Sequence, residues 1–326
     1  MLGAAACGGS STPEPQTFEF GPYALAAGQE ISGQCVSVTL HNEEPLYVNA
    51  VELSTGPGFH HSNWFWVPDY RFEGPDGTWN CADRAFDDAV AGIDGGVLFA
   101  QSTQTTHEVQ QFPEGMAIVV PAHSRILSGT HLLNTSDEPL SVSLSLTVTP
   151  IAEPTTMLAA MSFTNESIAL PPHRLSRFTI ECDIDSAHRA VLGRPLDFNV
   201  VYALAHYHKL GTGITIEALR DDGSGSMMFE TTTRIGDALG GMIDPGFSMA
   251  GFTKLRFSCN YDNPSDTTVR WGLGAGEMCT FLSFTDSEKT WGGGVLNRNG
   301  VPTVMDYGTY IEYTYPCAVI NSEPNR

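Results

Sequence analysis

A stretch of strict alternation in the middle of the chain sets the class of fold. Between Leu140 and Thr149, aliphatic residues occupy every second position, and serine or threonine occupies each position between them. Successive side chains of a β-strand point to opposite faces, so this pattern predicts a strand with one buried and one polar face. Short apolar and β-branched runs, separated by turn residues, recur along the chain. The sequence therefore predicts an all-β protein of sandwich-like sheets, with no helix of useful length.

The composition agrees with this class and narrows the range of partners. Of 326 residues, 41% are apolar and only 16% are charged, and the 33 glycines and 20 prolines indicate many turns. A formal net charge of −21 argues against nucleic acid and anionic membrane surfaces as partners. Apolar runs stay well short of the roughly eighteen residues that a membrane-spanning helix needs, so we expect no such helix.

The chain is predicted to have three parts. Residues 1–16 have the composition of a flexible tether. The segment 150–156, rich in proline and threonine, follows the alternating strand and is interpreted as a linker. We therefore expect an N-terminal β-sandwich domain at 17–150 and a C-terminal one at 151–326, each of ordinary domain size.

The seven cysteines bear on the cellular compartment. Cys7 stands between small residues and a Gly/Ser segment, similar to the end of a bacterial lipoprotein signal, although Ala4 occupies the position where leucine is usual. The pattern favours lipidation of Cys7, and with it membrane attachment, over an accidental likeness. An even number of cysteines remains, which predicts three disulfides and an extracytoplasmic setting, either secreted or in the cell envelope. These six are Cys35, Cys81, Cys182, Cys259, Cys279 and Cys317.

A buried strand is predicted to carry the first candidate metal ligands. It begins at Asn199, is apolar and β-branched, and ends in His206-Tyr207-His208. Strand alternation puts both imidazoles on one face, where they could converge on a metal ion. That face is predicted to hold Val200, Tyr202, Leu204, His206 and His208. Alone, the motif is weak evidence, because paired histidines near a strand end are commonly incidental.

Two further motifs add candidates. His60 and His61 are adjacent and would point to opposite faces of a regular strand, so a shared metal requires a strand end or a bulge, which the Gly-Pro-Gly break at 56–58 favours. Met278 follows a glycine-rich segment and is predicted to share a strand face with Thr280 and Leu282. A methionine is usually core filler, but its thioether is also a soft ligand that favours Cu(I).

Taken in order, these motifs resemble a known family. His60-His61, His131, His206-x-His208 and Glu277-Met278-Cys279 are similar to the motifs of the type II copper, ascorbate-dependent monooxygenases, which include peptidylglycine α-hydroxylating monooxygenase and dopamine β-monooxygenase. The resemblance covers roughly residues 30–318. It implies two jelly-roll β-sandwich domains in tandem, with copper sites that face an interdomain cleft.

The resemblance also implies the roles of individual residues. His60, His61 and His131 would hold an electron-transfer copper, and His206, His208 and Met278 the copper at which O₂ binds and the substrate is hydroxylated. Each site would be mononuclear, giving two coppers per chain, with an external reductant such as ascorbate. Glu277 is expected to orient a ligand or form a turn, and His107 to be an exposed loop residue. The implied disulfides are Cys35–Cys81, Cys182–Cys317 and Cys259–Cys279.

The chain departs from the peptide-amidating relative in the substrate region. That enzyme has an arginine two residues before its His-x-His pair, and asparagine and tyrosine two and four residues after its methionine. Leu204, Thr280 and Leu282 stand at these positions, and strand parity would turn all three toward the copper. Without the cationic clamp a buried carboxylate would lose its hydration uncompensated, so we expect a small neutral or weakly polar substrate.

Two other function classes compete with an oxidoreductase. The same ligands suit a non-catalytic copper-binding protein for storage, delivery or sensing. The histidines could also be incidental in a β-sandwich binding module. Turnover with O₂ and a reductant separates the first class from the second, and absence of bound copper would favour the third. The substrate, the physiological reductant and the oligomeric state are left open.

Overall fold

The computed structural model describes residues 13–272 and 274–324. Cys7 and most of the predicted tether lie outside the described residues. Strand β1 (Gln16–Leu25) takes in the last residue of that tether. No helix in the described part is long and apolar enough to cross a membrane.

Strands are the dominant regular structure of the described residues, as expected. The N-terminal half contains β1, β2 (Glu30–Thr39), β3 (Leu46–Thr55), β4 (Phe59–Pro68), β5 (Gly77–Asn80), β6 (Gly96–Ala100), β7 (His107–Gln111), β8 (Met116–Val120), β9 (Ser124–Leu133) and β10 (Leu140–Ile151). The C-terminal half begins with β11 (Thr156–Asn165), β12 (Ala169–Leu170), β13 (Arg174–Asp183), β14 (Asn199–His206), β15 (Gly211–Leu219), β16 (Gly225–Thr231) and β17 (Gly240–Ser248). It ends with β18 (Lys254–Asn263), β19 (Val269–Arg270), β20 (Thr280–Thr285), β21 (Thr290–Val295), β22 (Thr303–Asp306), β23 (Tyr310–Pro316) and β24 (Ala318–Ser322).

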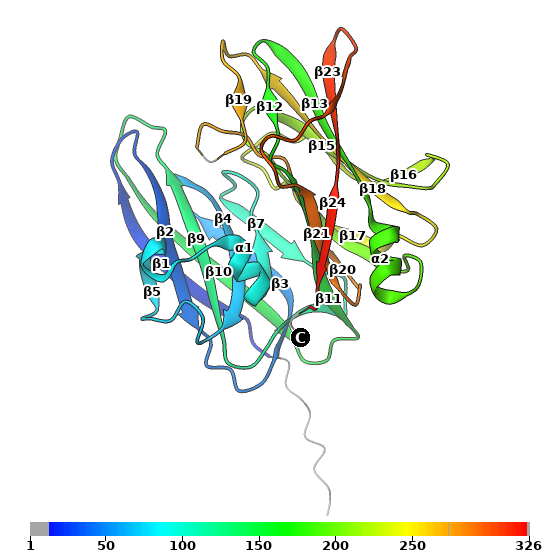
Figure 1. Ribbon diagram of the computed structural model, residues 1–326. Coiled ribbons are helices and arrows are strands. Elements are labelled where there is room, and N and C mark those ends of the chain that lie inside the picture. The colour runs from blue at the N-terminus through cyan, green and yellow to red at the C-terminus, as the bar shows by residue number, and fades with distance from the viewer. Residues whose placement is uncertain (1–12, 273, 325–326) are drawn as a thin grey trace, which may run out of the picture.

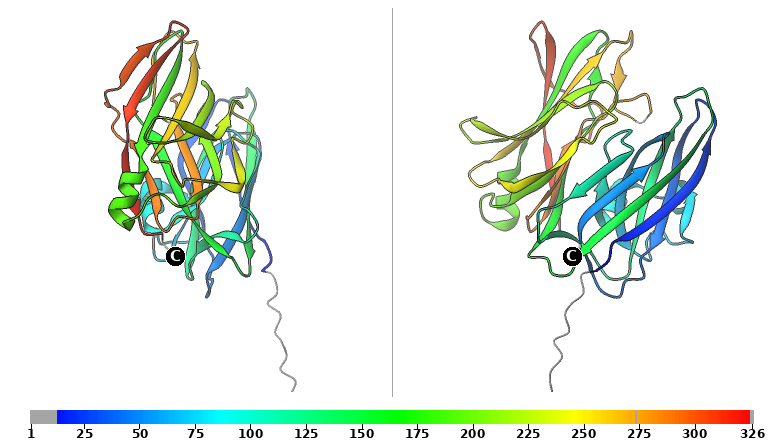
Figure 2. Two further views of the ribbon diagram at one scale, coloured as in Figure 1. Left: turned by 90° about the vertical axis from the view of Figure 1, so that its right-hand side faces the viewer. Right: turned by 180° about the vertical axis from the view of Figure 1, so that it is seen from behind.

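One long sheet runs through both halves of the molecule (Figure 1). Its main path is β1-β10-β3-β8-β11-β20-β14-β17, and the parallel pair β8–β11 joins the halves. A five-stranded sheet, β5-β2-β9-β4-β6, faces its N-terminal part, and a six-stranded sheet, β16-β15-β18-β13-β23-β22, faces its C-terminal part. Figure 2 shows the resulting sandwiches side by side. The predicted all-β class of sandwich-like sheets is therefore confirmed.

Alternation along β10 accounts for the N-terminal sandwich. The side chains of Val142, Leu144, Leu146 and Val148 are buried, whereas Ser141 and Ser143, on the opposite face of the strand, are exposed. Burial of each aliphatic side chain contributes about 1.5–3 kcal/mol of transfer free energy. The same core cluster takes in residues from β2, β4 and β9 of the facing sheet.

The boundary predicted between residues 150 and 151 falls at the very end of β10, whose last residue is Ile151, and β11 begins at Thr156. The buried residues form one main cluster within 20–158 and another within 161–315. The first cluster includes six residues from the C-terminal half: Leu158, Val201, Tyr202, Leu204, Leu282 and Phe284. The halves thus share a sheet and part of a core rather than meeting only at a linker.

Two short helices add to the predicted all-β pattern. Helix α1 (Asp88–Asp94) follows a 3₁₀ turn, η1 (Cys81–Arg84), and packs against β4 and β6. Helix α2 (Ile184–Leu192) begins after Asp183, whose side chain accepts a hydrogen bond from the Ser186 N–H. It ends at Gly193 with a φ of 71°, a left-handed conformation that favours glycine. Both are too short for a clear helical period in the sequence.

The predicted face assignment on β14 is wrong at its start. Val200 packs into the C-terminal cluster, whereas Tyr202 and Leu204 pack into the N-terminal one. The cause is a β-bulge between Val200 and Tyr202, which appears in the pairing with both neighbouring strands. One extra residue reverses the alternation of the residues before it. From Tyr202 onward the predicted alternation holds.

All three implied disulfides are present. Cys35 is bonded to Cys81, Cys182 to Cys317, and Cys259 to Cys279. Each bridge lies within one half of the chain. Three bridges indicate an oxidising compartment.

Candidate metal centre

Five histidines from distant parts of the sequence meet at one place. His60 and His61 come from the start of β4, His131 from β9, His206 from the end of β14, and His208 from the turn after it. The pairing of β4 with β9 shifts register between Phe59 and His61, so the irregularity expected from the sequence is present. Because of it, the two adjacent rings lie on the same side of the strand and close together. We call these five residues the histidine cluster.

The two predicted ligand sets are not separated from each other. Within the first set, ring centroids lie 5.0 Å (His60–His61), 4.6 Å (His60–His131) and 5.3 Å (His61–His131) apart. Between the two sets, the ring centroids of His61 and His206 lie 5.1 Å apart, and those of His60 and His208 lie 5.6 Å apart. The structure therefore differs from the expectation of two sites across a cleft. The shared sheet brings the end of β14 directly against β4.

Three rings of the cluster have one nitrogen against an oxygen acceptor. Nε2 of His131 lies 2.7 Å from a carboxylate oxygen of Glu30, Nδ1 of His206 lies 3.2 Å from the Gln101 carbonyl, and Nδ1 of His208 lies 2.8 Å from the Gly276 carbonyl. Metal-binding histidines are typically held in this way, which fixes the tautomer and leaves the other nitrogen for the metal. Among the described residues, Nε2 of both His60 and His208 is buried without a hydrogen-bond partner.

The spacing of the remaining nitrogens suits a metal ion. Ligand atoms of His60, His61 and His208 all lie within 4.8 Å of one another. Nε2 of His61 lies 3.5 Å from Nδ1 of His131. Two nitrogens bound tetrahedrally at about 2 Å from one ion are separated by about 3.3 Å. The donor set therefore fits a metal with little movement of the rings.

Burial favours the uncharged form of four of the five rings, those of His60, His61, His206 and His208. It lowers the pKa of His60 and His206 to about 3, with neighbouring imidazoles adding to the effect, and it lowers the pKa of His61 and His208 as well. Neutral imidazole is the form that binds metals. Structural histidines buried in a core normally satisfy their polar nitrogens, so two unpartnered Nε2 atoms argue for a ligand role.

A loop that the sequence analysis did not single out supports the cluster. It comprises residues 101–104, between β6 and β7. The Gln101 carbonyl contacts His206, and the Gln104 side-chain amide lies 3.2 Å from Nδ1 of His60. Thr103 donates a hydrogen bond from its hydroxyl to the carbonyl of Tyr207. This loop therefore contacts ligand-bearing segments of both halves, and its composition carries no signal of that role.

Glu277 acts on the main chain, in agreement with the expected orienting or turn-forming role. Its carboxylate accepts hydrogen bonds from the N–H groups of His208 (2.9 Å) and Leu210 (2.7 Å), which fixes the turn after β14. Burial raises the pKa of Glu277 to about 7 against the opposing effect of these bonds. His107 is exposed as expected, but it lies on β7 rather than in a loop.

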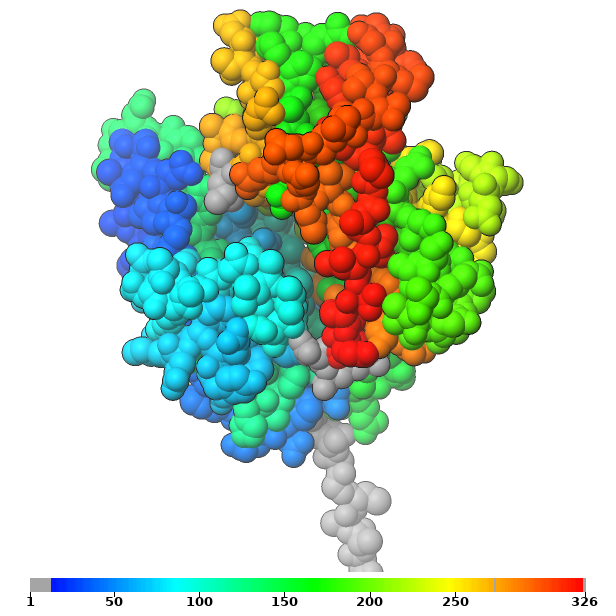
Figure 3. Space-filling view, viewed as in Figure 1, coloured from blue at the N-terminus to red at the C-terminus, as the bar shows by residue number. Residues whose placement is uncertain are grey.

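A cavity of about 420 Å³ adjoins the cluster. Met278, His61 and His206 share its wall with all three candidates for the substrate pocket, Leu204, Thr280 and Leu282. Cys279 faces the C-terminal core instead, so the predicted alternation around Met278 is correct. Figure 3 shows the surface hollowed between α1 and the red strand β24.

The cavity wall is mostly apolar but includes one carboxyl group. Asp88, the first residue of α1, lines the cavity together with Asn63. Its side chain is open to the cavity, yet the surrounding protein restricts its hydration and raises its pKa to about 6. Near neutral pH this side of the cavity is therefore largely negative.

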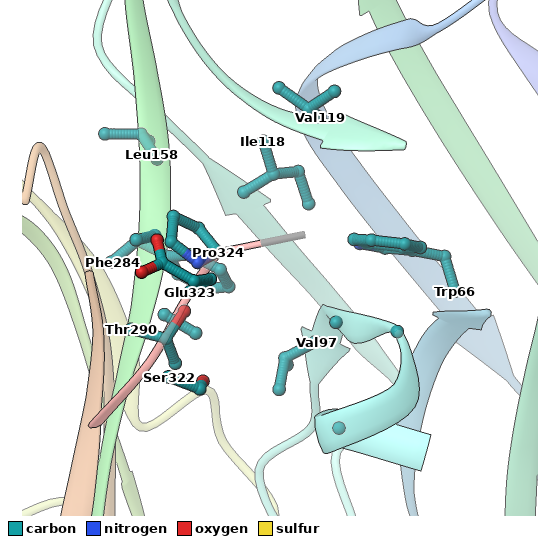
Figure 4. Close-up of a pocket in the computed structure, with 15 residues that line it drawn as sticks. Trp66, Val97, Ile118, Val119, Leu158, Phe284, Thr290, Ser322, Glu323 and Pro324 are labelled. Atoms are coloured by element: carbon teal, nitrogen blue, oxygen red, sulfur yellow. The ribbon is translucent and has the colours of Figure 1, made fainter. Parts of the chain in front are cut away.

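A second, smaller hollow of about 60 Å³ lies between the halves and contains no histidine (Figure 4). Trp66, Ile118, Leu158 and Phe284 line it, and the C-terminal residues 322–324 form one side. Val97 lines both hollows, so the two adjoin each other. Apolar side chains share the wall of the smaller hollow with Thr290, Ser322 and Glu323.

Comparisons with known proteins place the chain in no family. No family model and no curated protein matches it. The major capsid protein P2 of bacteriophage PM2 is similar at 9% identity and a TM-score of 0.32, over 88% of this chain and 100% of that one. PNGase F, a glycosylasparaginase from Flavobacterium meningosepticum, has 9% identity and a TM-score of 0.32, over 95% and 100%. Similarities this low carry no argument about function.

Proposed function

We propose that this protein is a copper-dependent monooxygenase that hydroxylates a C–H bond of a small, neutral substrate. The histidine cluster and Met278 would hold the copper, and the adjoining cavity would hold the substrate. The observation that carries the proposal is the convergence of five buried imidazoles, three of which have one nitrogen against an oxygen acceptor and the other nitrogen left for a metal. The order of the motifs, similar to that of the copper monooxygenases, selects copper among the metals that imidazole binds.

Copper bound here would supply one-electron redox steps and a centre open to O₂. The net reaction inserts one oxygen atom into the C–H bond and releases the other as water, with two electrons and two protons from an external reductant such as ascorbate. By the resemblance, His60, His61 and His131 serve electron transfer, and His206, His208 and Met278 serve O₂ and the substrate.

The chain's own groups would prepare the ligands for this chemistry. Glu30 and the carbonyls of Gln101 and Gly276 fix three ring orientations. Glu277 holds the turn that carries His208. Met278 contributes a soft sulfur, which favours the reduced state of copper.

The cavity supports a neutral substrate over an acid. Leu204 and Leu282 line it beside His206, so a substrate carboxylate would lose hydration without a cationic partner. Asp88 on the same wall would repel it further near neutral pH. We therefore place glycine-extended peptides outside the substrate range.

Burial of the cluster favours one alternative, a non-catalytic copper-binding protein. The five histidines are between 2% and 8% exposed, which suits storage or delivery of an ion shielded from solvent. The adjoining cavity favours the monooxygenase, because storage needs no space for a substrate beside the ligands.

Turnover decides between the two functions. Copper-loaded protein is incubated with ascorbate, isotopically labelled O₂ and a panel of neutral aromatic and aliphatic compounds. We expect reductant-dependent O₂ consumption and one labelled oxygen atom in a product. The variant His107→Ala, which changes an exposed histidine outside the cluster, should behave like the parent. Tight copper binding without labelled product from any compound would favour the storage or delivery protein.

The compartment follows in part from the bridges. Three disulfides agree with a secreted or cell-envelope protein. We further propose a lipid anchor at Cys7, on the sequence pattern alone. Labelling with a fatty-acid analogue in a bacterial host, lost on Cys7→Ser, would test it.

A further inference from the structure

We infer that the histidine cluster binds two metal ions as a close, interacting pair, rather than in two isolated mononuclear sites. The inference rests on the metal-binding part of the proposed function and goes beyond it, because hydroxylation by two isolated coppers would not need the pair.

Ring distances show no division within the cluster. His206 and His208, from one predicted set, lie 5.5 Å apart, whereas His61 lies 5.1 Å from His206 across the sets. His60, His61 and His208 also form a three-nitrogen group that mixes the sets. Two ions bound by these rings would therefore be neighbours with no protein layer between them.

His61 lies at the centre of the cluster. Its ring is 5.0 Å from His60, 5.3 Å from His131, 5.1 Å from His206 and 5.9 Å from His208. His61 is the one member of the cluster whose ring contacts all four of the others. Loss of this one ring should therefore disturb both ions together.

The number of donors exceeds what one ion uses. A four-coordinate ion takes about four ligands, whereas the cluster offers five imidazoles, with the Met278 thioether on the adjoining wall. Nε2 of His61 and Nδ1 of His131 are spaced as two ligands of one ion, while the unpartnered Nε2 atoms of His60 and His208 remain for a second.

The segments that support His131 and His208 also approach each other. Gly274, in the glycine-rich segment before Met278, approaches Glu30 so closely that a Cβ there would lie 3.0 Å from a Glu30 carboxylate oxygen. Glu30 contacts His131, and Gly276 of the same segment contacts His208. A bulkier residue at Gly274 would thus crowd the carboxylate that supports His131.

The test is a Cu(II) titration of the full chain, followed by electron paramagnetic resonance and by elemental analysis. The first equivalent of Cu(II) should give the paramagnetic resonance spectrum of an isolated Cu(II) ion. The second should broaden the lines and produce a half-field transition, or reduce the signal per copper more than twofold. His107→Ala should reproduce the parent titration. His131→Ala should bind one equivalent tightly, with an isolated spectrum, in protein whose circular dichroism is unchanged.

Each other outcome is decisive. Two bound equivalents whose isolated signals simply add would overturn the pair while leaving the monooxygenase proposal intact. A single retained equivalent in the parent would also overturn the pair. No retained copper would overturn the proposed function itself. As a check independent of folding in the variants, X-ray absorption of the doubly loaded parent should contain a copper–copper contribution.

Discussion

Nε2 of His131 lies 2.7 Å from Oε1 of Glu30, so a carboxylate from β2 fixes a ring on β9 that faces His61. In the proposed copper site, Glu30 would therefore act as a positioning residue. Glu30→Gln keeps an acceptor but removes the charge, and Glu30→Ala removes both. We expect copper affinity to fall about 10–100-fold in the alanine variant and less in the glutamine variant.

Competition with a chelator of known affinity measures this effect. Glu19→Gln, an exposed change on β1, serves as the matched control. If Glu30→Ala binds copper as tightly as the control, the Glu30–His131 contact has no part in holding metal.

Met278 should matter for reactivity rather than for folding. Met278→Leu keeps the volume of the side chain and removes its sulfur, so the free energy of unfolding should change by less than about 1.5 kcal/mol. Reductant-dependent O₂ consumption should collapse. Met242→Leu, at an exposed position on β17, controls for loss of a methionine as such. Full activity in Met278→Leu would make Met278 a wall residue only.

The Cys259–Cys279 bridge should support both stability and copper binding. It closes a loop with a sequence separation of 20 residues, so replacing both cysteines with alanine should lower the free energy of unfolding by about 3 kcal/mol. Copper affinity should fall too, since Met278 and Glu277 directly precede Cys279. The pair Cys35→Ala/Cys81→Ala should destabilise the protein but spare copper affinity. Denaturant unfolding and chelator competition, run on both pairs, check this contrast; equal copper affinities would contradict it.

Glu108 should make stability depend on pH. Its side chain is 2% exposed, and burial raises its pKa from 4.5 to about 7, opposed by hydrogen bonds from Ser102. The folded state therefore binds this proton more tightly than the unfolded state does. The stabilisation is complete below pH 4.5 and is lost as the pH rises through about 7.

Glu108→Gln removes this titration. Relative to the parent, the metal-free variant should gain up to about 3 kcal/mol between about pH 5 and about pH 8. The histidine cluster makes the free energy of unfolding rise with pH in both proteins. Its contribution therefore cancels when the variant is compared with the parent. The control Glu114→Gln, at an exposed position, should have the same pH dependence of its free energy of unfolding as the parent. If the free energy of unfolding of Glu108→Gln also follows that of the parent at every pH, the buried carboxyl does not titrate in this range.

Substrate choice should follow the apolar wall at Leu204. In competition, neutral aromatic or aliphatic compounds should be oxidised in preference to a glycine-extended peptide. Leu204→Arg should shift the preference toward the peptide, because it introduces a cation beside His206. Efficient amidation of the peptide by the parent protein would sink this prediction, since it would reveal a carboxylate clamp elsewhere in the cavity.

Much of this architecture can be predicted from local pattern. Alternation along 140–149 gives a strand, and the Gly-Pro-Gly break before His60 anticipates the bulge that turns His60 and His61 together. The resemblance supplied the three disulfides. These features depend on residues close in sequence or on an ordered set of motifs.

The rest depends on long-range pairing that no local pattern reports. The parallel contact of β8 with β11 joins the halves, and it brings the two histidine sets into one cluster. The bulge after Val200 comes from pairing with strands 40 or more residues away. Glu30 and Gln101 become supports only because they fold against rings about 100 residues away in sequence.

Copper content after reconstitution shows whether the histidine cluster binds copper. The full chain is loaded with Cu(II), dialysed against a weak chelator and analysed for metal, beside a variant that carries His61→Ala and His208→Ala. We expect close to two copper ions per parent chain and less than one in the variant, with both proteins folded by circular dichroism. A parent chain that retains no copper, or a variant that retains as much as the parent, would contradict it.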